Sequence, residues 1–121
     1  MPTATGHTKA IRASRVIGTN VYDTSGSKIG EVEDVMLDKT TNQIMFGVIG
    51  FGGFLGVGEK YHPVPWSVLD YQEDKGGYGV PMTKEQLEAA PADSIEKLTE
   101  NDGIAYRDRS YEYYKAEPYW S

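Results

Sequence analysis

Short runs of apolar residues alternate with turn-forming residues along the first part of the chain. The apolar and β-branched runs lie at 16–22, 29–37 and 44–51, and turn residues separate them at 23–27 and 38–42. Short strands at close spacing are typical of a small β-barrel or sandwich. The run 44–51 is apolar on both faces, which predicts a strand in the interior of the sheet. We therefore expect a mainly β fold, a small antiparallel β-barrel that is closed or partly open.

The second predicted strand breaks the alternation of apolar and polar positions. Val32 has one parity, whereas Val35 and Leu37 have the other. An extra residue at Glu33 and Asp34 restores the register, so we predict a β-bulge there. The Asp34 carboxylate could then accept a hydrogen bond from the backbone that the bulge frees, and this structural role is favoured over a catalytic one.

Two further strand signals follow. Pro63 and Pro65 lie within a predicted strand at 60–66, and prolines at this spacing remove two donors from the same side of a strand. Such a strand belongs at a sheet edge or at the mouth of a barrel. Residues 69–81 predict a hairpin whose turn is at 74–77.

The pattern becomes helical after the predicted barrel. Thr83 and Gln86 form a capping box that opens a helix, and this helix stops before Pro91. Asp93 and Glu96 repeat the signal for a second short helix. The predicted helices span 84–90 and a second segment that ends near Leu98.

These patterns divide the 121 residues into four segments. They are a flexible N-terminus (1–9), a barrel (10–82), a short helical appendage (83–100) and a tyrosine-rich tail (101–121). The tail could fold back on its own barrel, reach across to a second copy or stay disordered. Its aromatic content argues against simple disorder, and tyrosine is favoured at interfaces. The candidate interaction residues of the tail are Tyr111, Tyr113, Tyr114 and Trp120.

The composition narrows the chemistry that the chain can carry out. It has no cysteine, which excludes disulfides, thiolate metal sites and cysteine nucleophiles. Of the two histidines, His7 lies in the flexible N-terminus, and His62 has no second histidine or cysteine at ligand spacing. His62 is interpreted as a barrel-edge residue. We expect no metal, no cofactor and no catalytic residues, because no nucleophile–base pattern is present.

The net charge of −6 is unevenly distributed. Residues 1–30 are basic and residues 31–100 are strongly acidic, without the cluster of Lys and Arg that nucleic acid requires. Direct nucleic-acid binding is therefore not expected. A helix over 44–58 would be about 22 Å long, short of the ~30 Å hydrocarbon core, and its glycines would destabilise it. We expect no membrane span, and the absence of a signal-peptide pattern predicts a cytoplasmic protein.

Fourteen glycines are present, and many of them gather in the run 50–58. Gly53 and Gly58 have the spacing of a phosphate-binding loop, but Glu59 follows where that loop requires lysine. Two interpretations remain: bends between strands, or an interaction loop with an exposed apolar patch. The candidate interaction residues of this region are Phe51, Phe54, Leu55 and Val57.

Two segments resemble the PRC-barrel family. They are Gly30-Glu31-Val32-Glu33-Asp34 and Val64-Pro65-Trp66. This small barrel is shared by the cytoplasmic domain of the photosynthetic reaction centre H subunit and the C-terminal domain of the ribosome maturation factor RimM. The resemblance covers about residues 10–82 and transfers no catalytic residue. The reaction centre subunit has a membrane helix before its barrel and the maturation factor has a separate N-terminal domain, so this chain resembles a stand-alone form.

The resemblance implies a non-enzymatic barrel used for assembly or protein contact. Together with the glycine-rich loop and the aromatic tail, it predicts self-association as a homodimer or larger homo-oligomer. Two alternatives remain open. One is an accessory factor in ribosome or RNA processing, and the other is an auxiliary protein of a photosynthetic or other membrane complex.

Overall fold

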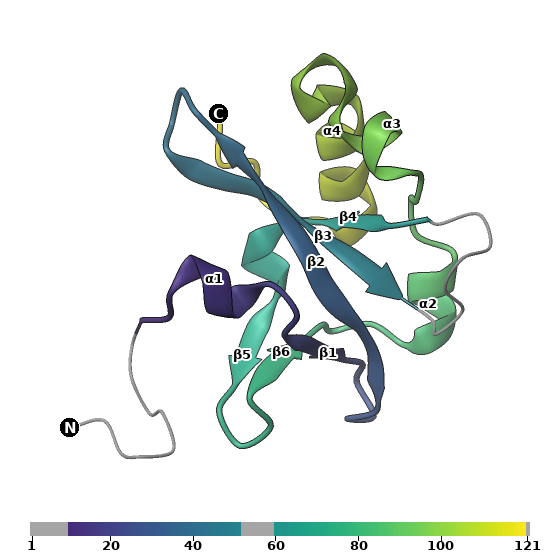
Figure 1. The fold of residues 1–121 in the computed structure, drawn as a ribbon. Coiled ribbons are helices and arrows are strands. Elements are labelled where there is room, and N and C mark those ends of the chain that lie inside the picture. The colour runs from purple at the N-terminus through teal and green to yellow at the C-terminus, as the bar shows by residue number, and fades with distance from the viewer. Residues whose placement is uncertain (1–9, 52–59, 121) are drawn as a thin grey trace.

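The computed structural model describes residues 10–51 and 60–120, which form one six-stranded sheet and a set of short helices (Figure 1). The strands are β1 (Asn20–Tyr22), β2 (Lys28–Asp38), β3 (Gln43–Phe51), β4 (His62–Val64), β5 (Asp70–Gln72) and β6 (Gly77–Gly79). The helices are α1 (Ala13–Val16), α2 (Lys84–Glu88), α3 (Ile95–Thr99) and α4 (Ile104–Tyr114), with 3₁₀ turns η1 (Trp66–Val68) and η2 (Glu100–Gly103).

The strand order is β4-β3-β2-β1-β6-β5, so β4 and β5 are the edges and the sheet of the described residues is not closed. This confirms the mainly β fold in its partly open form. The proline-containing strand lies at an edge, as predicted. The predicted antiparallel arrangement holds for every neighbouring pair except β1 and β6, which are parallel, so the sheet is mixed. These two strands are distant in the sequence, so no local turn sets their relative direction.

The long pairing of β2 with β3 contains two irregularities. Glu33 has no partner in the register, which is where a bulge is predicted, and the Asp34 carboxylate accepts a hydrogen bond from the Val35 N–H at 2.8 Å. The second irregularity leaves Met45 of β3 without a partner. Bulges bend strands and increase their twist, which is consistent with the curved β2–β3 ribbon (Figure 1).

Strand β3 is buried on both faces and divides two clusters of apolar side chains. We call them the barrel core and the second core. The barrel core comprises Val16, Val21, Val32, Ile49, Val64, Tyr78, Val80, Leu87, Ala90 and Tyr114. The second core comprises Met45, Phe46, Val48 and Leu98, with Met36, Tyr61, Ile95, Tyr106 and Tyr119 packed against it. Ile49 and Val48 point to opposite cores, as alternation along a strand requires. Met45 and its neighbour Phe46 share the second core, because the irregularity at Met45 interrupts that alternation.

The N-terminal strand is shorter than predicted. A strand from residue 16 is wrong, because Val16 ends helix α1 and is 7% exposed within the barrel core. The helical turn buries this β-branched residue without a place in the sheet. Similarly, the strand predicted at 60–66 is limited to β4, and Trp66 begins η1.

The helices agree with the local signals only in part. Helix α2 begins with the predicted capping box of Thr83 and Gln86. Helix α3 begins one residue later than its signal indicates, with Ser94 as the N-cap in place of Asp93. Helix α4 is not predicted by the sequence pattern, and it places the tail against the sheet. None of the helices within 10–51 and 60–120 is long and apolar enough to cross a bilayer.

Candidate interaction surface

The C-terminal segment folds back on its own chain. Of the three interpretations of the tail, the structure contains the first. Helices α3 and α4 stand together at the end of the molecule opposite β5 and β6, and the chain then runs toward the tip of the β2–β3 hairpin (Figure 1). Helix α4 is a polar helix in which Ser110, Tyr111 and Tyr114 are buried.

Four tyrosine hydroxyls attach this segment to the rest of the chain, and we call them the tyrosine anchors. Two donate to carboxylates and two donate to backbone carbonyl oxygens. The pairs are Tyr106–Asp93 (2.6 Å), Tyr111–Met45 (2.9 Å), Tyr113–Gln86 (2.6 Å) and Tyr119–Asp38 (2.7 Å). All four acceptors precede residue 94. Directed hydrogen bonds therefore hold the segment, in addition to apolar contacts with both the barrel core and the second core.

The Tyr111 anchor uses the irregularity in the sheet. Met45 is the residue of β3 that the register leaves out, and its carbonyl oxygen accepts the Tyr111 hydroxyl. Burial raises the pKa of Tyr111 further above neutral pH, where a tyrosine hydroxyl is already protonated and able to donate. The ring also packs edge-on against Trp120, with 4.8 Å between the ring centroids. The Tyr111 side chain thus donates a hydrogen bond to the carbonyl oxygen at the bulge and packs against Trp120 near the end of the chain.

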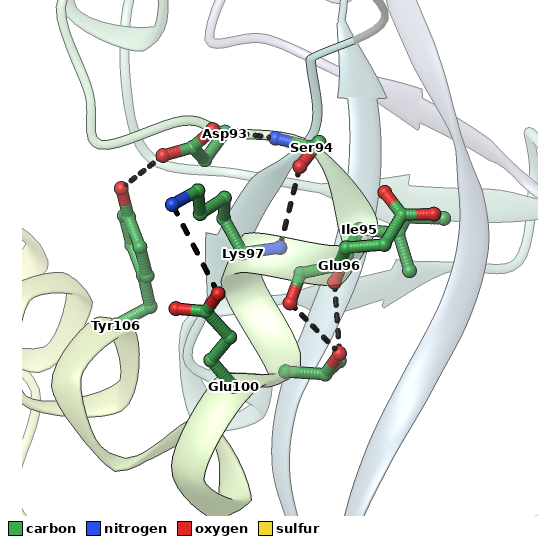
Figure 2. A network of polar contacts seen from close by, with 8 residues as sticks. Asp93, Ser94, Ile95, Glu96, Lys97, Glu100 and Tyr106 are labelled. Carbon is green, nitrogen blue, oxygen red and sulfur yellow. Dashed lines mark hydrogen bonds and ion pairs between the residues drawn. The ribbon is translucent and has the colours of Figure 1, made fainter.

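The Tyr106 anchor belongs to a polar network at the start of α3 (Figure 2). Asp93 pairs with Tyr61 through two backbone hydrogen bonds, and its carboxylate accepts from Tyr106 and from the Ser94 N–H. The bond from Tyr106 is the main reason that the pKa of Asp93 lies below its ordinary value. Because Asp93 is engaged with Tyr106, the Ser94 hydroxyl caps the helix by accepting from the Lys97 N–H.

The Tyr119 anchor ties the end of the chain to the β2–β3 hairpin. The Asp38 carboxylate accepts hydrogen bonds from Thr40 and from Tyr119, and both hold the pKa of Asp38 well below its usual range. Burial, together with the bond to Asp38, raises the pKa of Tyr119 to about 12. The Arg107 guanidinium lies 3.6 Å from the centre of the Trp120 ring. This cation–π contact connects α4 with the residues that follow it.

The candidate interaction residues of the tail therefore have different surroundings. Tyr111 and Tyr114 are buried within their own chain, at 6% and 7% exposure, and are core residues rather than an exposed surface. The Tyr114 hydroxyl has no hydrogen-bond partner among the described residues, and burial raises its pKa. Tyr113 and Trp120 are half-buried. Tyr113 connects α4 to α2 through its bond to Gln86.

The glycine-rich region is described only at its boundaries. Phe51 is half-buried and packs against the barrel core. The other three candidates, Phe54, Leu55 and Val57, lie outside the described residues.

His62 is a buried residue of the edge strand β4. Its ring lies 4.7 Å from the Phe51 ring, measured between centroids, and its side chain is hydrogen-bonded to the backbone of Pro91. The Nδ1 atom has no partner in the described part of the chain. Burial lowers the pKa of His62 to about 4, so the ring is neutral at neutral pH. Within 10–51 and 60–120, no group of three or more His, Cys, Asp or Glu side chains could hold a metal ion.

A second surface lies at the opposite end of the molecule, beside the edge strand β5. Tyr71 of this strand is 42% exposed. A nearby open pocket of about 310 Å³ is bordered by Tyr22, Asp70, Gln72 and Lys75, among other residues. The Lys75 ammonium lies 5.1 Å from the centre of the Tyr22 ring and 3.5 Å from the Gly26 carbonyl oxygen. The sequence reasoning did not identify this surface, because it is assembled from two separate turns.

Comparison with known proteins separates the anchor acceptors from the anchor donors. The sequence model of the family described as "PRC-barrel domain" matches residues 9–87. A Deinococcus radiodurans protein named "Uncharacterized protein" is 28% identical over 109 residues, which cover 85% of this chain and 39% of the relative. The chain therefore spans about two fifths of that relative's length. Three anchor acceptors, Asp38, Met45 and Gln86, lie within the family match, whereas all four tyrosine donors lie beyond it.

Proposed function

The chain belongs to the PRC-barrel family, and on that basis we propose that it is a non-enzymatic module for protein contact and assembly that associates with itself. The observation that carries the proposal is the docking of the tyrosine-rich helix α4, which packs against β4 and reaches the side of β3 that carries the second core, here called the outer face. This face carries both apolar side chains and hydrogen-bond acceptors. Those features suit the binding of a helical segment.

The chemistry of this face resembles that of a protein interface. Phe46 and Val48 provide buried apolar area, and the Met45 carbonyl oxygen and the Asp38 carboxylate accept from tyrosines. Interfaces are enriched in tyrosine because its ring packs while its hydroxyl finds a partner. A helix that inserts such anchors into a groove is a recurrent mode of recognition.

The titratable groups support a non-enzymatic role. The carboxylates with lowered pKa, Asp23, Asp38 and Asp93, accept hydrogen bonds within turns or from tyrosines. A general acid or base works best with a pKa near the operating pH, and these shifts move the carboxylates further from it. His62 is neutral and buried. The acidic balance of the chain, −6, favours protein partners over nucleic acid.

Self-association is tested by light scattering on the full chain over a wide range of concentration. We expect a reversible increase in mass from monomer to dimer. Tyr71→Ser changes the exposed tyrosine at the opposite end of the molecule and should leave this increase unaltered. A chain that remains monomeric at every concentration would contradict self-association.

The ability of the outer face of β3 to bind a helix is tested with a labelled peptide of residues 101–120. The receptor is full-length chain with Tyr111→Ala, which weakens its own α4, and circular dichroism checks that it remains folded. We expect the peptide to bind, and a matched peptide with phenylalanine in place of all four anchor tyrosines to bind more weakly. Equal binding of the two peptides would contradict recognition through the hydroxyls.

A further inference from the structure

The connection between α3 and α4 is a strained segment. We call Asn101, Asp102 and Gly103 the hinge. All three residues have positive φ, at 50°, 64° and 73°. The left-handed region is disfavoured for residues with a Cβ, although Asn and Asp tolerate it better than most. The close return of α4 onto its own barrel therefore requires two consecutive non-glycine residues in a disfavoured conformation.

The hinge separates the donors of the tyrosine anchors from their acceptors. Every donor follows Gly103, and every acceptor precedes Asn101. The contacts of Trp120 with Arg107 and Tyr111 lie wholly within the segment after the hinge. A second copy of the chain could thus supply the same segment to the same face and reproduce every anchor.

Helix α4 depends on that face for its stability. Its N-cap is Gly103, which provides no side-chain hydrogen bond, and its first turn has no acidic residue. A helix of this length is marginal by itself in water. The segment is therefore held by tertiary contacts, and these contacts do not depend on which copy provides them.

We propose that α4 and the residues after it exchange between two copies of this chain, with the hinge leaving the left-handed region and each segment packing against the partner's β4 and second core. The proposal rests on the proposed self-association and specifies its mechanism. Exchange retains the anchors and removes the strain at both hinges. It forms a closed pair in which the same surface is used twice, the commonest arrangement of homodimers.

The test uses two substitutions at one exposed hinge position. Asp102→Val increases the strain of the closed form, because a β-branched residue is a steric outlier at positive φ. Asp102→Gly relieves the strain. At each hinge the left-handed penalty corresponds to about a tenfold change in an equilibrium constant. We therefore expect the dimer dissociation constant from light scattering to fall at least tenfold for Asp102→Val and to rise for Asp102→Gly.

A second hinge variant shows whether the effect of Asp102→Val comes from hinge strain or from a local loss of structure. Gly103→Ala strains the closed hinge in two ways, because φ is +73° and the new Cβ would lie 3.2 Å from Met36 Cε. It should shift the equilibrium in the same direction as Asp102→Val, with circular dichroism confirming that the helices persist. Folded variants whose dissociation constants match the wild type would overturn the exchange.

Nuclear magnetic resonance determines whether α4 packs on its own chain or on the partner copy. Isotope-labelled and unlabelled copies of the full chain are refolded together, and intermolecular contacts are selected by isotope filtering. We expect an intermolecular signal between Tyr111 and Met45. A dimer without this signal overturns the exchange and leaves self-association standing. The absence of a dimer in the wild type and in all variants overturns both.

Discussion

The Tyr111 hydroxyl donates a hydrogen bond of 2.9 Å to the Met45 carbonyl oxygen, although 66 positions separate the two residues in the chain. Met45 is the residue of β3 that the β2–β3 register leaves without a partner. Helix α4, which lies outside the family match, thereby provides a hydrogen-bond donor to the carbonyl oxygen of an irregular position in the sheet. The bond also shows that the tail is part of the fold.

Removing the Tyr111 hydroxyl tests the importance of this bond. Tyr111→Phe should lower the free energy of unfolding by about 1–3 kcal/mol, because it leaves a buried acceptor without its donor. Tyr113→Phe is the matched control, since its hydroxyl bonds to Gln86 at an exposed position and should cost about 1 kcal/mol or less. Urea unfolding followed by circular dichroism measures both. Equal losses would contradict a special role for the Met45 carbonyl.

A substitution at Gly30 tests whether the close approach of the β2 and β3 backbones requires glycine at this position. A Cβ at Gly30 would overlap the Gly50 carbonyl oxygen on the neighbouring strand. Gly30→Ala should therefore destabilise the chain by about 3 kcal/mol. Gly50→Ala is the control, because its Cβ would meet the Glu33 side chain at 3.4 Å, an ordinary contact. If both alanine variants unfold at the same urea concentration, the close approach is not what requires glycine at position 30.

Leu98 tests whether the helical appendage belongs to the same folding unit as the barrel. It is fully buried in the second core, which shares β3 with the barrel core. Leu98→Ala should cost about 2–5 kcal/mol and retain a single unfolding transition. Ile104→Ala, at a residue 45% exposed in α4, should change stability by about 0.5 kcal/mol or less. Two separate transitions in calorimetry would contradict a shared unit.

His62 should make stability depend on pH between its pKa in the unfolded chain, about 6.5, and its pKa of about 4 in the folded chain. In this window the unfolded chain binds more protons than the folded one. The free energy of unfolding should therefore decrease as pH falls, by at most about 1.4 kcal/mol per pH unit.

Urea titrations across that window, on the wild type and on His62→Gln, measure the effect. The variant should lose the slope. Asp23, Asp38 and Asp93 have lowered pKa values, so their contribution to stability begins to be lost as pH falls toward the ordinary carboxyl pKa of 3.8. The slopes of the wild type and the variant are therefore compared above about pH 5, where these carboxylates contribute little. A slope that persists unchanged in His62→Gln would contradict the assignment to this residue.

Several elements could be read from the sequence because their causes are local. The capping box of Thr83 and Gln86 joins residues three positions apart, and the hairpin predicted with its turn at 74–77 has it one residue earlier, at 73–76, between strands that are adjacent in the chain. The irregularity at Glu33 was visible because alternation along one strand is a property of that strand alone. The same holds for the edge position of β4, since Pro63 removes a backbone donor wherever the strand lies.

The tertiary structure decided the features that depend on distant partners. The periodicity of residues 104–114 does not predict a helix, and α4 exists because its tyrosines find acceptors far away in the sequence. Asp93 has the chemistry of an N-cap but bonds to Tyr106, which transfers the cap to Ser94. The parallel pairing of β1 with β6 likewise joins strands with no turn between them.

The sequence by itself therefore determined a small, mainly β domain with a helical end, because hydrophobic alternation and turn chemistry act over a few residues. Only the tertiary structure decided where the aromatic tail goes. A tyrosine can pack in a core, cover a partner or remain in solvent, and the choice depends on which acceptors come within hydrogen-bond distance. Here the bulged Met45 and Asp38, at the end of β2, provide them, and the outer face of β3 becomes the surface on which the function is proposed to rest.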